Sequence, residues 1–209
     1  MRWLAVTVLS LSLAAAARGE DIVDVLRRSQ QQRLESFVPV AHSARAETIR
    51  RSYALLSDRL GPLPPIDLHV VHGPIVAETL HGHIIVVNES VADLPEGERL
   101  FLIAHEIGHV VNRHWMQLGL VYRTWVPGEV TPQTTDPVAG PLGREASQTA
   151  HRHELEADLF ALQALQSVGV PTDAAFSSLR LMGLQQDTAT HPGTRKRLAS
   201  LRAATRQSE

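Results

Sequence analysis

The chain contains no cysteine among its 209 residues. That absence excludes a thiol nucleophile, a disulfide framework and every zinc site built from thiolates. A bound metal ion would therefore have to be held by histidine and carboxylate side chains. The sequence has 11 histidines, which is many for this length and leaves such a site open.

Lysine is nearly absent too, because Lys196 is the only one and arginine carries the remaining positive charge. The formal net charge is -2 and no strongly basic stripe occurs, which argues against nucleic acid as a partner. Hydrophobic residues make up 44% of the chain, enough for one domain with a sizeable core. No internal repeat or second domain is visible.

Long apolar runs are also missing, except for one that extends from Leu4 to Ala17 after the charged Arg2. The run ends in small residues, as export signals do, and is shorter than the ~20 residues of a membrane span. We expect residues 1–19 to be a cleaved signal peptide and residues 20–209 to form one domain outside the cytoplasm, in a bacterial periplasm. The alternative is an uncleaved membrane anchor.

The central motif is His105-Glu106-Ile107-Gly108-His109, with apolar residues on both sides. The flanks predict a buried helix that starts at Pro95 and runs to about Leu118. His105 and His109 are four residues apart, so they share one helix face and can reach one metal ion. Glu106 points to the side, where it can take a proton from an attacking water. The alternative for so short a pattern is a pair of hydrogen-bonded histidines without a metal.

A catalytic zinc ion needs a third protein ligand and one open position. A helix predicted over 144–168 offers Glu154 and Asp158, which are four residues apart and share a face. Glu154 can ligate while Asp158 accepts the N–H of a ligating imidazole. Glu156 lies about 200° round from Glu154 and is the weaker candidate. The alternative is an acidic face exposed to solvent.

One further histidine follows the motif closely. His114 is five residues past His109, which places it about 140° round a continuous helix. We therefore expect it to have a structural role and not to ligate the same ion.

Periodicity and breaker residues predict the remaining elements. The expected helices cover 21–37, 41–60, 172–186 and 194–204, the expected strands cover 66–71 and 83–88, and a turn covers 190–193. Residues 75–82 fit neither period. Residues 122–142 are rich in proline, glycine and threonine and are expected to form a long irregular loop. The predicted fold is α+β: a mostly helical single domain with a small β-sheet.

Three motifs occur in a fixed order. The first is the central motif followed by Arg113-His114, the second is Glu154-x-x-Ala157-Asp158, and the third is Thr190-His191-Pro192-x-Thr194-x-x-Arg197. Together they resemble the HtpX-like, BepA-like and type I CaaX prenyl endopeptidase family of zinc metallopeptidases, which are gluzincins. The resemblance covers roughly residues 40–205, and the chain looks like a soluble, minimal-domain member.

The resemblance implies one zinc ion bound by His105, His109 and Glu154. It implies Glu106 as the general base and Asp158 as the group that orients a ligand. It also implies a zincin-like fold in which an edge strand of the sheet borders the active-site cleft.

The resemblance further implies that His191 lies close to the metal and that Arg197 supports the site. Two roles remain open for His191: a hydrogen-bond donor to the oxyanion, or a fourth zinc ligand that keeps the enzyme latent. We expect an extended substrate to pair with the bordering strand. The strand residues expected to bind substrate are Ile84, Ile85, Val86, Val87 and Asn88.

The expected function is an exported zinc metalloendopeptidase that hydrolyses peptide bonds with a zinc-activated water and a glutamate base. Its substrates would be peptides or unfolded proteins, and its role extracytoplasmic protein quality control. The alternative is a non-catalytic extracytoplasmic chaperone or assembly factor on the same metal-binding fold. An intact Glu106 favours the enzyme, because holding a peptide requires no general base.

Overall fold

The motif lies on helix α3 (Glu96–Val111) in the computed structural model, which describes residues 19–207. The expected export signal falls almost entirely on residues 1–18, outside the described residues. Every residue from Leu100 to Gly108 is buried, as the apolar flanks predict. Glu96 and Glu98 occupy the first turn, where negative charge favours the helix dipole.

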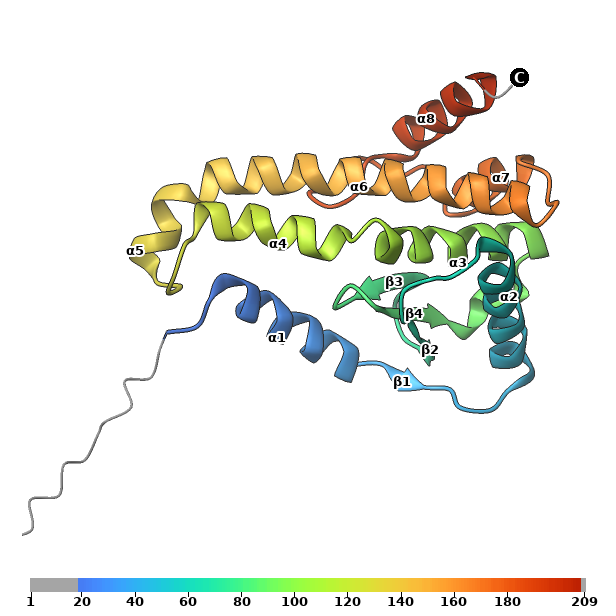
Figure 1. Ribbon diagram of the computed structural model, residues 1–209, viewed down its shortest axis with the longest axis horizontal. Coiled ribbons are helices and arrows are strands. Elements are labelled where there is room, and N and C mark those ends of the chain that lie inside the picture. The colour runs from blue at the N-terminus through green and yellow to red at the C-terminus, as the bar shows by residue number, and fades with distance from the viewer. Residues whose placement is uncertain (1–18, 208–209) are drawn as a thin grey trace, which may run out of the picture.

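The motif helix ends earlier than predicted. It stops at Val111, and Arg113 adopts a left-handed conformation with φ 56° before α4 (His114–Trp125) begins. A non-glycine residue rarely adopts this conformation, so the sequence contained no sign of the break. Figure 1 shows α3 and α4 following one another beneath α6 (Ala139–Ser167), which packs against both.

The long irregular loop predicted over residues 122–142 is also wrong. The segment holds the end of α4, the short helices α5 (Pro132–Thr135) and η2 (Asp136–Val138), and the first turn of α6. Thr131 caps α5 through the backbone N–H of Thr134. Pro132, Pro137 and Pro141 occupy first-turn positions, where no backbone N–H is needed, and so they mark helix starts, whereas Pro127 lies in the loop after α4.

The sheet has four strands in the order β1-β2-β4-β3. β2 and β4 are parallel, and the other pairs are antiparallel. The strands are β1 (Val38–Pro39), β2 (Asp67–His72), β3 (Ala77–Leu80) and β4 (Ile84–Asn88).

The strand order corrects the expected substrate edge. β4 pairs with β2 on one side and with β3 on the other, so it is an interior strand. Its central residues Ile85, Val86 and Val87 are fully buried, and an unbroken apolar run of this kind is typical of a strand covered on both faces. The edge strand next to β4 is β3, from the segment that fitted neither period, and β1 forms the opposite edge.

Helices cover both faces of this sheet. On one face, Leu34 of α1 (Ile22–Glu35) and Phe37, just after it, pack with Leu80 and Val86. The opposite face contributes Ile85 and Val87 to the main core with α3. The remaining elements are α2 (Ala44–Leu60), η1 (Glu89–Asp93), α7 (Asp173–Leu181) and α8 (Thr194–Gln207). None of the described helices combines the length and apolar character that a membrane crossing requires.

The predicted helix over 172–186 is too long. α7 ends at Leu181, and Gly183 follows with φ 81°, a conformation that glycine adopts without strain. The chain therefore turns back early and leads to the loop that carries His191.

Candidate metal centre

Three side chains from two helices converge on one point. His105 Nε2 and His109 Nε2 lie 3.2 Å apart on α3. Glu154, on α6, places Oε1 3.3 Å from His109 Nε2 and Oε2 3.6 Å from His105 Nε2. A tetrahedral zinc ion with ligand bonds of ~2.0–2.1 Å separates its ligand atoms by about 3.3 Å, so this triangle has the size that zinc requires. Glu154 Oε2 is buried without a hydrogen-bond donor, and the guanidinium of Arg197 lies at ion-pair distance, with Nη1 3.7 Å away.

A glycine lets the two helices approach each other closely. A Cβ atom on Gly108 would lie 3.2 Å from the Cα atom of Ala157 and 3.1 Å from Cβ of Phe160. Gly108 and Ala157 therefore form the close contact between α3 and α6. This contact places Glu154, three residues before Ala157, within reach of the motif histidines.

Asp158 and Arg197 lie behind His105. Asp158 is fully buried, and its Oδ1 lies 3.0 Å from His105 Nδ1. Arg197, on α8, donates to both oxygens of this carboxylate, over 2.8 Å to Oδ2 and 2.5 Å to Oδ1. Because a carboxylate can only accept, His105 Nδ1 carries the hydrogen and His105 Nε2 presents its lone pair to Glu154 and His109.

The charges of this cluster favour a cation. Burial raises the pKa of Glu154, but interactions with His105 and His109 outweigh it and hold the pKa well below its ordinary value. Burial lowers the pKa of His105, but the contacts with Asp158 and Glu154 outweigh it and raise the pKa to about 10. The point between these groups is therefore electrostatically favourable for a cation.

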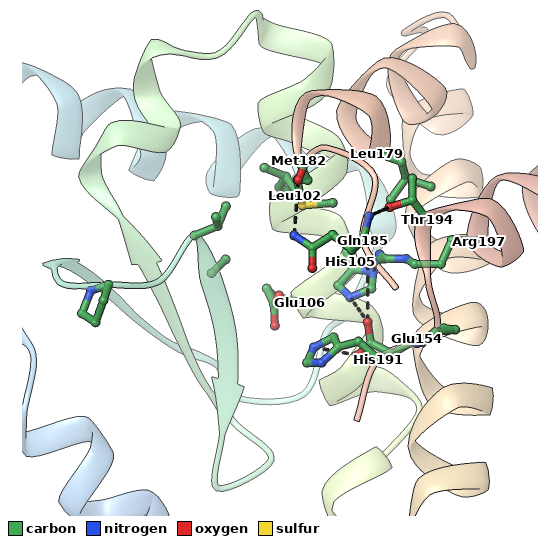
Figure 2. Close-up of a pocket in the computed structure, with 14 residues that line it drawn as sticks. Leu102, His105, Glu106, Glu154, Leu179, Met182, Gln185, His191, Thr194 and Arg197 are labelled. Carbon is green, nitrogen blue, oxygen red and sulfur yellow. Dashed lines mark hydrogen bonds and ion pairs between the residues drawn. The ribbon is translucent and has the colours of Figure 1, made fainter. Parts of the chain in front are cut away.

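Glu106 lies beside this cluster and does not join it. Its side chain is 7% exposed, and Oε2 accepts a hydrogen bond of 2.7 Å from Thr79 Oγ1. Glu106 lines a cleft of about 400 Å³ together with His105, Glu154 and His191. Figure 2 shows these four side chains close together. Apolar residues complete the wall of the cleft: Val76, Ala77, Leu102, Leu179 and Met182.

His191 lies at the mouth of the cleft, in the loop before α8. Its Nε2 is 3.8 Å from Glu154 Oε1, and its Nδ1 is 2.8 Å from the hydroxyl of Thr190. The side chain is 59% exposed, so it can meet a bound substrate. The structure thus brings His191 and Arg197 to the same site as the three expected ligands.

The expected substrate strand lies away from this site. None of the described residues that line the cleft comes from β4, whereas Ala77 of β3 lines it. The oxygen of Val76 accepts from Asn88 N over 2.9 Å, so in the alternating antiparallel pattern the backbone groups of Ala77 and Thr79 point toward the open edge. The open edge beside Glu106 therefore belongs to β3.

His114 contacts the site in a way that the sequence did not predict. It does not join the ligand triangle, but its Nδ1 lies 2.9 Å from His109 Nδ1 and its Nε2 lies 3.1 Å from Glu156 Oε2. Its ring stacks on that of His153, with centroids 4.0 Å apart. Burial, and then the charge of His109, lower the pKa of His114 to about 3. The break at Arg113 explains the contact, because the expected angle of about 140° between His109 and His114 holds only on one continuous helix.

One of the comparisons with known proteins found a match that contains the central motif. Residues 75–128 match the model of peptidase family M48. The match runs from just before β3 into the loop after α4 and includes the central motif. A comparison with curated proteins found no match to the chain.

Proposed function

We propose that this chain is a member of peptidase family M48, whose model matches residues 75–128, and that it is a zinc-dependent metalloendopeptidase. The observation that carries this proposal is the ligand-sized triangle of His105, His109 and Glu154 with the separate carboxylate of Glu106 beside it. A purely structural zinc site would have four protein ligands and would need no such carboxylate.

In this proposal, each residue has one task. A zinc ion held by His105, His109 and Glu154 would lower the pKa of a water molecule and polarise the scissile carbonyl. Glu106 takes the proton from the attacking water and then delivers it to the leaving amine. His191 Nε2 donates a hydrogen bond to the oxygen that becomes negative in the transition state.

We propose that the substrate lies in extended form along β3. The outward backbone groups of Ala77 and Thr79 would pair with the substrate backbone, which gives affinity with little demand on sequence. The apolar wall formed by Leu102, Leu179 and Met182 supports a preference for an apolar side chain near the scissile bond.

The substrates and location are part of the same proposal. The N-terminal pattern supports export, and recognition through the backbone suits unfolded proteins of many sequences. We therefore propose a role in protein quality control outside the cytoplasm.

Removal and return of the metal test the proposal. Purified protein should contain one zinc ion per chain and cleave casein, lose cleavage when a chelator removes the zinc, and regain it with one equivalent of zinc. A protein that holds zinc and binds unfolded casein without cleaving it would instead be the chaperone of the alternative account.

A further inference from the structure

We propose that His114 and Glu156 position His109 as a metal ligand, through a chain of hydrogen bonds that determines which ring nitrogen of His109 carries its hydrogen. The chain is Glu156 Oε2–His114 Nε2, 3.1 Å, followed by His114 Nδ1–His109 Nδ1, 2.9 Å. This inference rests on the metal site of the proposed function and extends that site to α4.

The position of each hydrogen follows from the donors and acceptors. A carboxylate only accepts, so the hydrogen between Glu156 and His114 belongs to His114 Nε2. In a neutral imidazole the other nitrogen is then an acceptor, so His114 Nδ1 accepts from His109 Nδ1. His109 Nε2 is left with a lone pair, and this atom is the one that faces His105 and Glu154.

The surroundings hold His114 in this position. Its side chain is 4% exposed, and its ring lies at 5° to the ring of His153 in a parallel stack. His153 Nε2 lies 3.2 Å from Gln117 Oε1 and is held in turn. The left-handed residue Arg113 starts a new helix, and this change of direction returns the next side chain toward His109.

The two metal-site histidines are therefore supported differently. His105 meets a carboxylate directly, that of Asp158, which Arg197 neutralises. His109 instead bonds to the neutral imidazole of His114, and His114 in turn bonds to the carboxylate of Glu156. α6 supplies Glu154, Glu156 and Asp158, so one helix provides a ligand and the end point of both supporting chains. Glu156 reaches the site through α4 even though it points away from Glu154.

Zinc affinity tests this inference without any measurement of proteolysis. The zinc dissociation constant would be measured by competition with a chromophoric chelator, with circular dichroism to verify folding. His114→Phe keeps a ring to stack on His153 but removes the acceptor, and should weaken zinc binding about 10–100-fold. His114→Asn places an oxygen near the position of Nδ1 and should restore most of the affinity. Glu156→Ala should have a smaller effect, since it removes only the end of the chain.

His69→Phe is the control. His69 lies on β2, where it contacts Asp67, and it is not among the described residues that line the cleft, so the variant should leave zinc affinity unchanged. If His114→Phe bound zinc as tightly as wild type, the inference would be wrong while the metal site stood. A wild-type protein that bound no zinc would instead overturn the metal site itself and this inference with it.

Nitrogen NMR of zinc-loaded wild type gives a second test that needs no variant. With ¹⁵N-labelled histidine, His109 should carry its hydrogen on Nδ1, and His114 should carry its hydrogen on Nε2 alone. A hydrogen on His114 Nδ1 would contradict the proposed chain, whatever the variants show.

Discussion

The hydroxyl of Thr79 lies 2.7 Å from Glu106 Oε2, so the edge strand holds the carboxylate that we propose as the general base. The same hydroxyl is 3.1 Å from the backbone oxygen of Glu106, and its single hydrogen can serve one acceptor at a time. A substrate that pairs with β3 would therefore bind to the strand that also orients the base.

Thr79→Val tests this contact. Valine keeps the branched shape of threonine but cannot donate, so the carboxylate loses its fixed direction. We expect kcat for casein cleavage to fall about tenfold, as the loss of one hydrogen bond to a charged group would give. Zinc content should not change. Thr79→Ser retains the hydroxyl and should stay close to wild type, and an equal loss in both variants would show that the hydroxyl is not responsible.

Gly108→Ala tests the close contact between α3 and α6. The new methyl group would lie 3.2 Å from the Cα atom of Ala157, so α6 would have to move by a few tenths of an ångström and carry Glu154 with it. We expect weaker zinc binding and a lower unfolding temperature, although alanine favours a helix over glycine by ~1 kcal/mol. Gly143→Ala is the matched control, because a Cβ atom there meets open space on α6. Equal zinc affinity in both variants would remove this explanation for the position of Glu154.

His191→Ala separates the two roles that the sequence left open. When the hydroxyl of Thr190 donates to His191 Nδ1, the hydrogen lies on Nε2 and can be donated to the oxyanion. The variant should then lower kcat about 10²–10³-fold with little change in KM. If His191 were instead a fourth ligand that keeps the enzyme latent, the variant would cleave casein faster than wild type.

Met182→Asp tests the apolar wall of the cleft. A carboxylate in this wall would oppose an apolar side chain and attract a basic one, so peptides with leucine near the scissile bond should lose cleavage relative to peptides with arginine. Mass spectrometry of the products of a mixed peptide library measures the preference. Leu184→Asp places the same charge on a residue that is 77% exposed, and a shift of equal size there would assign the effect to general electrostatics.

The ligand residues could be predicted because their geometry is local. His105 and His109, like Glu154 and Asp158, are four residues apart, and helix periodicity alone places each pair on one face. The structure brings the two pairs together through the Gly108–Ala157 contact, whose glycine lies inside the motif itself.

The contact of His114 and the order of the strands cannot be predicted from helix or strand periodicity. The contact of His114 with His109 requires one left-handed residue, Arg113, in a segment that the sequence predicted as one continuous helix. The identity of the strand at the cleft depends on strand order, and the more regular strand, β4, lies in the interior of the sheet. A strongly β-branched run therefore indicated the centre of the sheet, while the short, irregular β3 borders the site.

Glu106→Gln tests the central claim most directly. The amide cannot take a proton from water, but Glu106 does not contact the three proposed ligands, so the variant should hold one zinc ion per chain and lose casein cleavage by orders of magnitude. Zinc content and cleavage would be measured on the same preparations of variant and wild type. Full cleavage by a zinc-loaded Glu106→Gln variant would contradict the account, because the proposed general base would then have no part in hydrolysis.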